Sequence, residues 1–255
     1  MFWLYAAPAA RMAALQKLRW IGIATHDSIC TGDNGPTHQP VSLASFYRSL
    51  PDINIIRPAD AEEVVGAYQV AMADLDRPSI LSLSRNALPL LPGSCRDGVA
   101  KGACIVHKGK SDSPDIVLLA TGGEVSRAIS TAQQLQSKHQ FDVRVVSFPS
   151  FKHFDRQSKE YRQLTIPTRK SLVIAIEAWA SFGWSRYAHA GFHMHTFGRA
   201  APEEVLYEHF GFGVDNMTSE IAAYSKTLRT SNGGWDLPAV GEYHDFLDGF
   251  AGHHQ

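Results

Sequence analysis

Short apolar runs alternate along the chain with longer segments of helical character, and this alternation constrains the fold more than any other feature. In the first part of the chain, three such runs predict buried strands at residues 20–24, 53–57 and 80–84. Helices are predicted over residues 41–50 and from Asp60 to about residue 75, with Asp60 and Glu63 as a capping pair. Because strands that alternate with helices form parallel sheets covered on both faces, we predict an α/β fold.

A second alternation of the same kind follows a stretch rich in proline and glycine at residues 89–102, which is typical of a linker. Beyond it, strands are predicted at residues 115–120, 142–147 and 172–177, and helices at 124–138 and 202–210, the last with Pro202 in its first turn. We therefore predict two three-layer domains with parallel sheets. Their limits are residues 1–90 and 108–235, with a linker at 91–107 and a tail at 236–255.

The charge balance and the cysteines exclude several classes of protein. The 255 residues carry 24 Lys and Arg against 25 Asp and Glu, so no strong net field attracts nucleic acid or an anionic membrane. Cys30, Cys95 and Cys104 lack CxxC spacing, which argues against a disulfide or zinc framework and favours a reducing compartment. No apolar run approaches the roughly twenty residues that span a bilayer. We expect a cytoplasmic protein with no nucleic-acid partner and no membrane partner.

The stretch at residues 1–10 is apolar and rich in small residues, as a short secretory signal would be. It lacks the basic residues that open such a signal, because the first charge, Arg11, follows the apolar part. We therefore expect this stretch to form a buried helix of a domain whose beginning is missing.

One polar loop stands apart from generic α/β sequence. It follows the first predicted strand and reads Thr-His-Asp-Ser-Ile-Cys-Thr-Gly-Asp-Asn-Gly-Pro-Thr-His-Gln-Pro over residues 25–40. Open α/β sheets bind ligands at the carboxyl ends of their strands, where this loop lies. The side chains of His26 and His38 suit proton transfer and hydrogen bonding to sugar hydroxyls near neutral pH. We interpret the segment as a functional loop; the alternative is a polar surface loop.

The loop closely resembles the transketolase motif THDSxxxGEDGPTHQP, and further blocks agree with that family in the same order. These blocks are Arg57-Pro58-Ala59-Asp60, Leu83-Ser84-Arg85, Ala120-Thr121-Gly122-Gly123-Glu124-Val125-Ser126 and Glu208-His209-Phe210-Gly211-Phe212. The resemblance extends from Phe2 to Ser225, and it does not separate transketolase from the related dihydroxyacetone synthase. It implies an incomplete pyrimidine-binding domain followed by the C-terminal domain of the family.

The resemblance also implies roles for individual residues. In the family, thiamine diphosphate carries a two-carbon ketol unit from a ketose phosphate to an aldose, or to formaldehyde in dihydroxyacetone synthase. By resemblance, His26 contacts substrate hydroxyls and His38 is a candidate proton shuttle. The same resemblance places Ser84 and Arg85 at the substrate, with the planar donors of Arg85 suited to its phosphate. Phe2 falls where the family stacks an aromatic ring on the aminopyrimidine of the cofactor, and Tyr5 falls beside it; both could instead be ordinary core residues.

Two departures from the family pattern put the substrate preference in doubt. Asp33-Asn34 stands where the family has Glu-Asp, so a substrate-reading carboxylate has become the uncharged amide of Asn34. Asn86 follows Arg85 where Gln is usual, which would weaken the contacts around the substrate phosphate at Arg85.

The family's Mg²⁺ and diphosphate are held by an earlier domain, with a GDG signature that we do not find in this sequence. The glutamate that activates the aminopyrimidine ring also lies upstream of the block that contains Phe2. A positioned acid or base contributes about a hundred- to ten-thousand-fold, so we do not expect this chain to be active alone. The resemblance implies a homodimer or a complementing amino-terminal half as partner, and a sugar phosphate or small aldehyde as substrate. A catalytically inactive binding or regulatory protein, or a gene fragment, is the alternative.

Three further features have alternative interpretations. His189, His193 and His195 have the spacing of a metal cluster, but no Asp, Glu or Cys completes it nearby in the sequence. Gly122-Gly123 would form either a phosphate cradle or a tight strand-to-helix turn. Glu177, with two nearby tryptophans, is interpreted as a packing residue at a domain or subunit contact.

Overall fold

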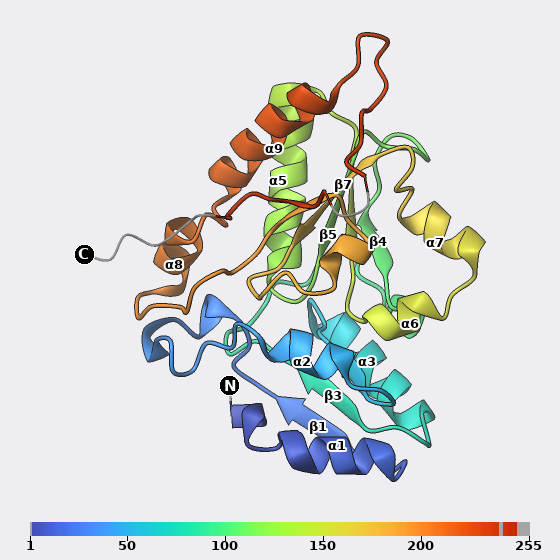
Figure 1. The fold of residues 1–255 in the computed structure, drawn as a ribbon, viewed down its shortest axis with the longest axis vertical. Helices are drawn as coiled ribbons and strands as arrows, with labels where there is room; N and C mark the ends of the chain where they lie inside the picture. The colour runs from blue at the N-terminus through green and yellow to red at the C-terminus, as the bar shows by residue number, and fades with distance from the viewer. Residues whose placement is uncertain (1, 240–241, 249–255) are drawn as a thin grey trace.

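The computed structural model describes residues 2–239 and 242–248, and two sheets, each lying between helices, make up the fold (Figure 1). The first sheet is parallel with the order β1-β3-β2, from β1 (Ile21–Ala24), β3 (Ser79–Ser82) and β2 (Asn54–Ile56). Their positions confirm the three strands predicted in this part of the sequence.

Alternate residues of the first sheet point to opposite faces, as the period of a strand requires. Ile55 and Ile80 pack with residues of α1 (Ala7–Leu15) and α2 (Leu43–Ser49). Ile56 and Leu81 pack on the other face with α3 (Ala61–Ala73). Asp60 caps α3 as predicted, because its carboxylate accepts a hydrogen bond from the N–H of Glu63 at 3.0 Å.

The amino-terminal stretch is less buried than the sequence indicates. A short 3₁₀ turn, η1 (Phe2–Leu4), precedes α1, which buries only Ala10, Ala13 and Ala14. Tyr5 is 85% exposed and Phe2 is 60% exposed. The helix exists, but the expectation of a buried helix was wrong for much of it, since Met12 and Leu15 are exposed and the aromatic residues Phe2 and Tyr5 precede it.

The second sheet has the order β4-β6-β5-β7-β8-β9 in the described part of the chain. Its strands are β4 (Cys104–His107), β6 (Val143–Ser147), β5 (Ile116–Ala120), β7 (Leu172–Ile176), β8 (Ala190–Phe192) and β9 (His244–Asp245). All neighbours are parallel except β4, which runs antiparallel to β6. Every residue of β5, β6 and β7 is buried, as expected for central strands covered on both faces.

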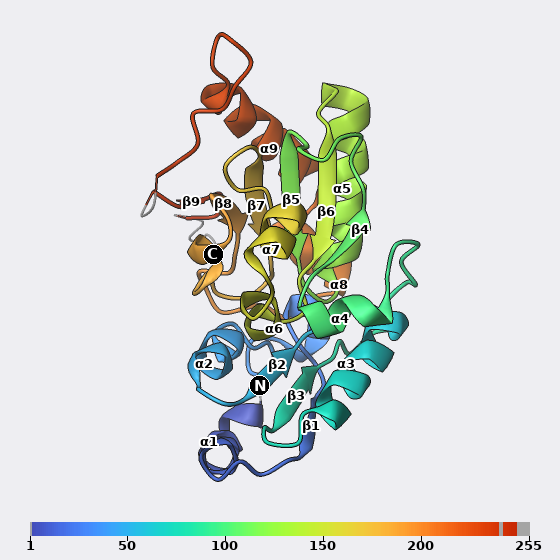
Figure 2. The same cartoon turned by 90° about the vertical axis from the view of Figure 1, so that its right-hand side faces the viewer.

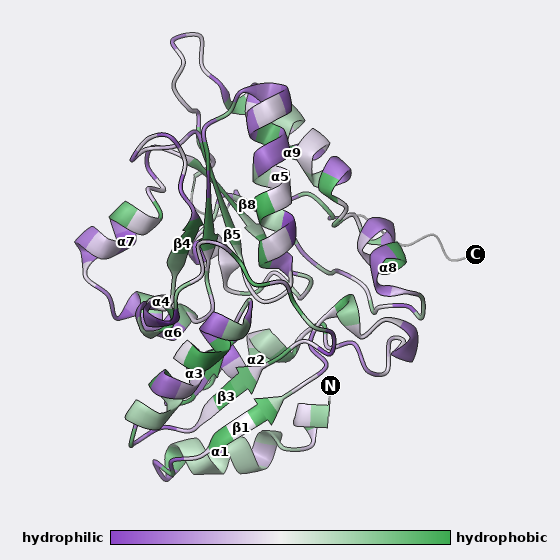
Figure 3. Cartoon of the chain, turned by 180° about the vertical axis from the view of Figure 1, so that it is seen from behind, coloured by the Kyte–Doolittle hydropathy of each residue, from purple (hydrophilic) through white to green (hydrophobic). Residues whose placement is uncertain are grey.

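Helices cover both faces of this sheet (Figure 2). One face carries α5 (Glu124–His139), α8 (Glu203–His209) and α9 (Val214–Leu228). The other face carries α6 (Phe151–Asp155), α7 (Lys159–Thr165) and the 3₁₀ turn η3 (Trp184–Arg186), around a cluster of aromatic rings. Figure 3 shows hydrophobic strands between helices that carry both polar and apolar residues.

The segment predicted as a linker, residues 91–107, contains regular structure. Helix α4 (Arg96–Lys101) packs against α3 and ends at Gly102, whose φ of 78° is left-handed. Strand β4 follows directly and joins the second sheet, so the proline and glycine residues mark turns rather than an extended connection. Strand β9 lies in the predicted tail, of which residues 240–241 and 249–255 are outside the described residues. The domain limits themselves stay predictions.

In the part of the chain that the structure describes, no helix combines the length and the apolar character needed to cross a bilayer.

Candidate functional site

The polar loop at residues 25–40 leaves β1 in a strained backbone conformation. His26 and Ser28 have positive φ angles of 66° and 51°, in a region that side chains with a Cβ rarely adopt. Gly32, inside the 3₁₀ segment η2 (Ile29–Asn34), also has a positive φ of 62°. Such strain persists only where the surrounding structure holds it, and it is concentrated at functional sites.

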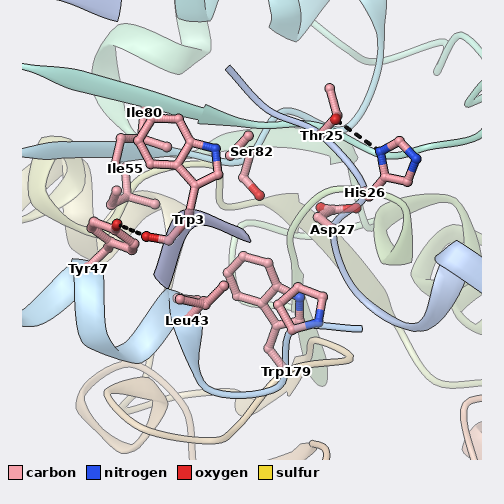
Figure 4. A pocket seen from close by; sticks show the side chains of 13 residues that line it. Trp3, Thr25, His26, Asp27, Leu43, Tyr47, Ile55, Ile80, Ser82 and Trp179 are labelled. Atoms are coloured by element: carbon pink, nitrogen blue, oxygen red, sulfur yellow. Dashed lines mark hydrogen bonds between the residues drawn. The ribbon is translucent and has the colours of Figure 1, made fainter. Parts of the chain in front are cut away.

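His26 lies at the edge of a small apolar cavity (Figure 4). Its Nδ1 lies 2.9 Å from the hydroxyl of Thr25. The cavity has a volume of about 30 Å³, room for about two water molecules. It is lined by Trp3, Thr25, His26, Asp27, Leu43, Tyr47, Ile80, Ser82 and Trp179, together with smaller residues.

The indole of Trp3 closes one side of this cavity. Its Nε1 donates to the carbonyl of Ile23 at 3.3 Å, and Tyr47 donates to the carbonyl of Trp3 at 2.5 Å. Gly22 is required beneath the ring, because a Cβ there would lie 2.2 Å from the indole. The volume of the cavity therefore depends on where Trp3 lies.

His38 lies beside Phe2 and is not among the side chains that line the cavity at His26. Its Nδ1 lies 2.9 Å from the hydroxyl of Thr37. The ring of Phe2 meets the imidazole edge-on at 5.2 Å between centroids, and Tyr5 stacks on Phe2 at 6.4 Å. The structure thus groups His38 with both aromatic residues that the sequence singled out.

Arg85 and Asn34 are in direct contact. The Nη1 of Arg85 donates to the Oδ1 of Asn34 at 2.6 Å and to the carbonyl of Thr31 at 3.0 Å. Ser84, by contrast, donates to the carbonyl of Asn86 at 2.7 Å. The loop and the end of β3 therefore form one polar corner.

Asn86 connects this polar corner to the part of the chain built around the six-stranded sheet, which we call the second unit; the part around the three-stranded sheet is the first unit. Its amide donates to the carbonyl of Cys30 at 3.2 Å and to Glu203, at the start of α8, at 2.6 Å. Asn86, which departs from the family pattern, is therefore held by the loop through Cys30 and by α8 through Glu203.

A buried cluster of charged side chains contacts the loop at Asp27 and Ser28. This cluster was not predicted from the sequence. Arg57 is 1% exposed, and its Nε donates to Asp27 at 2.5 Å. Its Nη1 donates to Glu124, the first residue of α5, and to the hydroxyl of Thr121 at 2.6 Å. Burial alone would lower the pKa of Arg57, but Asp27, Glu124 and Glu177 raise it well above the usual value.

Glu124 extends the cluster to the loop itself. Its Oε1 accepts hydrogen bonds from Tyr207 at 2.6 Å and from Ser28 at 3.3 Å. Ser28 is one of the two strained residues, so a side chain of the second unit contacts the loop directly.

Glu177 connects the two units through Arg48, which lies on α2. Two hydrogen bonds of 2.7 Å join the guanidinium of Arg48 to the carboxylate. Thr121 and the Nε1 of Trp184 also donate to Glu177, at 2.5 and 2.8 Å. Burial would raise the pKa of Glu177, but the charge and hydrogen bonds of Arg48, followed by the charge of Arg57, lower it to about 2. These contacts place Glu177 at a packing contact between the two sheets.

One sequence signal pointed toward Arg57 without being sufficient to identify it. Arg57 directly follows an apolar strand, and a cation there needs a charged partner only if it is buried, which the sequence does not show. Gly122 makes room for that cation: its φ is 54°, and a Cβ there would lie 2.6 Å from the Nε of Arg57. Gly122-Gly123 therefore forms a tight turn against the guanidinium of Arg57.

The histidines near residue 190 have other partners. His193 shares a hydrogen bond of 2.7 Å with Tyr243, and His195 lies 2.9 Å from Asp245 on β9. Within residues 2–239 and 242–248, no group of three His, Cys, Asp or Glu side chains is arranged to hold a metal ion.

Two family models match the chain. "Transketolase, pyrimidine binding domain" matches residues 1–90, and "Transketolase-like TK C-terminal domain" matches residues 102–213. The chain is 42% identical over 231 residues to dihydroxyacetone synthase of Candida boidinii, covering 91% of this chain and 32% of that protein. It is 44% identical over 220 residues to transketolase of Streptococcus pyogenes, covering 84% of this chain and 30% of that protein. The chain thus spans about a third of the length of these curated relatives.

Solved structures give the same result. Transketolase from Leishmania mexicana superposes with a TM-score of 0.86 at 39% identity, over 94% of this chain and 35% of that one. A split gene transketolase, solved as an inactive beta4 tetramer, superposes with a TM-score of 0.66 over 88% of this chain and 74% of that one. At 22% identity, the second match shows the fold alone.

Proposed function

Because this chain belongs to the transketolase family, as its pyrimidine-binding and C-terminal domains, we propose that it forms one wall of a ketol-transferring active site. The reaction would move a two-carbon unit between sugar phosphates, or to a small aldehyde. The observation that carries this proposal is the polar corner of Arg85 and Asn34, which lies at the carboxyl end of the first sheet beside the strained loop.

The residues present suit one end of thiamine diphosphate. The exposed rings of Phe2 and Tyr5, next to His38, offer the flat apolar surface that an aminopyrimidine would stack on. Among the described residues, no group of ligands suits a metal ion at the diphosphate end. When bound, the cofactor supplies the carbon centre that accepts the ketol unit. We propose that another polypeptide, or another part of a longer one, holds its diphosphate and Mg²⁺.

Both histidines of the loop are oriented by a neighbouring threonine. Thr25 engages the Nδ1 of His26, and Thr37 engages the Nδ1 of His38. This leaves the Nε2 atom of each imidazole to contact substrate, as a hydrogen-bond partner for a sugar hydroxyl or as a proton carrier. We propose the first role for His26 and the second for His38.

Arg85 would bind the substrate phosphate. Thr31 and Asn34 hold its Nη1, and the other N–H groups of its planar fork can contact an oxyanion. Because Asn34 is an amide, it orients Arg85 without neutralising the charge that the phosphate needs.

We propose a second copy or a complementing amino-terminal half as the partner. The two matching family models are the pyrimidine-binding and C-terminal domains, and the chain spans about a third of its curated relatives. The rest of the site would therefore come from another polypeptide or from another part of a longer one.

The experiment that tests the proposal combines this chain with the amino-terminal half of a transketolase relative. Ketol transfer from a ketose phosphate is measured in a coupled assay, and thiamine diphosphate binding with Mg²⁺ is measured by calorimetry. We expect activity only from the combination, with kcat about a hundred-fold lower or more for His38→Ala. His139→Ala, at the far end of α5, is the matched control and should leave kcat unchanged. Full activity of this chain alone, or an unaffected His38→Ala enzyme, would contradict the proposal.

A further inference from the structure

A groove on the second unit is lined by several positively charged side chains. Its residues lie more than 100 positions after the loop at residues 25–40 in the sequence. The groove is lined by residues of α7 and of neighbouring segments and has a volume of about 330 Å³. Helix α7 lies on the face of the sheet opposite to α5 (Figure 1). Four cationic side chains line the groove, with one carboxylate and the hydroxyl of a threonine: Lys159, Arg162, Arg169, Arg186, Asp155 and Thr168. The chain as a whole is nearly neutral, with 24 basic and 25 acidic residues, so this concentration of one sign is local.

The one carboxylate in the groove is already engaged. The Oδ2 of Asp155 accepts from Arg186 at 2.8 Å, and its Oδ1 accepts from Tyr187 at 2.8 Å. Within the described ranges, Lys159, Arg162 and Arg169 form no ion pair. All three side chains are exposed, so their N–H groups are available to an anion that enters the groove.

A buried arginine supports the segment that presents these cations. Arg144, on β6, is 1% exposed, and its Nη1 donates to the carbonyl of Leu164 at 2.8 Å, at the end of α7. Its Nη2 donates to the carbonyls of Ser111 and Asp112 at 3.3 and 3.2 Å. Arg144 thus fixes the end of α7 through backbone carbonyls, while Asp112 and Asp142 offset part of its charge.

We propose that this groove binds a small anion with two adjacent phosphate groups. The planar donors of arginine suit phosphate oxygens, and several of them can contact a diphosphate at once. The volume lies at the lower end of the range of small-molecule pockets. A single phosphate would leave part of the cationic lining without a partner. The site is separate from the loop that contains His26, so the inference does not depend on the proposed ketol transfer.

The test measures binding of inorganic pyrophosphate to the full chain by isothermal titration calorimetry at an ionic strength of about 0.1 M, where distant surface charges are screened. Orthophosphate and ADP are measured in parallel. We expect one pyrophosphate per chain, bound at least ten-fold more tightly than orthophosphate. ADP that binds more tightly than pyrophosphate would identify a nucleotide as the ligand, whereas equal affinity would indicate that the diphosphate alone is recognised.

A matched pair of double variants distinguishes binding in the groove from nonspecific attraction of the anion to positive charge. Arg162→Ala with Arg169→Ala removes two cations of the groove, and we expect pyrophosphate affinity to fall at least ten-fold. Arg11→Ala with Lys226→Ala removes two exposed cations from α1 and α9, and should change the affinity by less than two-fold. His26→Ala should leave it unchanged, which keeps this result distinct from the ketol-transfer site.

Three outcomes would overturn the proposal. They are the absence of saturable heat with pyrophosphate and ADP, an equal loss of affinity in both double variants, and tighter binding to a twenty-nucleotide RNA with several chains per strand. Near-ultraviolet circular dichroism establishes that each variant is folded, and the single variant Arg169→Ala, in the loop after α7, repeats the test where no helix is altered.

Discussion

The Nε of Arg57 lies 2.5 Å from the carboxylate of Asp27, the residue that directly follows His26 in the strained loop. The same guanidinium contacts Glu124 at the start of α5, so one arginine ties the loop to the second unit. The backbone of Asp27 is fixed as well, since its N–H donates to the carbonyl of Leu83 at 3.2 Å. The orientation of His26 therefore depends on residues in both units.

Removal of Arg57 should destabilise the fold strongly. Arg57→Leu leaves Asp27 and Glu124 buried without a counter-charge, and we expect a loss of about 3–5 kcal/mol in the free energy of unfolding. Urea denaturation followed by circular dichroism measures it. Arg96→Ala, which breaks an exposed pair with Glu62, should cost at most about 1 kcal/mol. Equal losses in the two variants would show that the buried cluster is not critical.

The pairing of Glu177 predicts a loss of stability in acid. Its pKa in the folded protein is lowered from 4.5 to about 2, so the stabilisation is present above pH 4.5 and is lost as the pH falls toward 2. A shift of this size corresponds to about 3 kcal/mol. Glu177→Gln should therefore be less stable than the wild type at pH 7, with a difference that shrinks by pH 2.5. A difference that stays constant across this range, in urea titrations at several pH values, would contradict the assignment.

Glu63 predicts the opposite dependence on pH. Burial raises its pKa from 4.5 to about 7, so its carboxyl group favours folding below pH 4.5 and loses that advantage as the pH rises toward 7. Glu63→Gln keeps an acceptor for the N–H of Ala59 and carries no charge. At pH 8 the variant should be about 3 kcal/mol more stable than the wild type, and at pH 4 nearly equal. The exposed neighbour Glu62→Gln serves as control, and thermal unfolding at both pH values is the measurement.

The contact between Asn34 and Arg85 can be measured by a double-mutant cycle. Asn34→Asp places a carboxylate at the 2.6 Å contact, and we expect a coupling energy with Arg85 of about 0.2–1 kcal/mol at pH 7, because the pair is exposed. Protonation of the new carboxylate should abolish the coupling at pH 3. The cycle requires the two single variants, with Arg85→Ala as the second, and their combination. Coupling that is independent of pH would mean that charge does not govern this corner.

The sequence predicted the central strands correctly because their apolar runs are short, continuous and bounded by Pro, Gly or charge. Strand β8 escaped prediction because Ala190-Gly191-Phe192 carries no β-branched residue, and its place depends on pairing with β7. Helix α9 was also missed, although Met217, Ile221 and Ser225 recur on its buried face, because Asn, Thr and Ser weaken its local helical signal.

The polar loop could be located from sequence because a ligand loop follows a parallel strand directly. The partners of Arg57 could not, because Asp27 and Glu124 lie 30 and 67 residues away along the chain. Nothing local distinguishes a buried cation that joins two units from one that faces solvent. Only the packing of the two sheets brings these charges together.

The pairs formed by Arg57 with Glu124 and by Arg48 with Glu177 join halves that the family models treat as separate. A cut between residues 90 and 102 would leave each half with charges that have lost their counterions, in places where water had been excluded. The two halves are thus expected to melt in a single cooperative transition, as one thermodynamic unit.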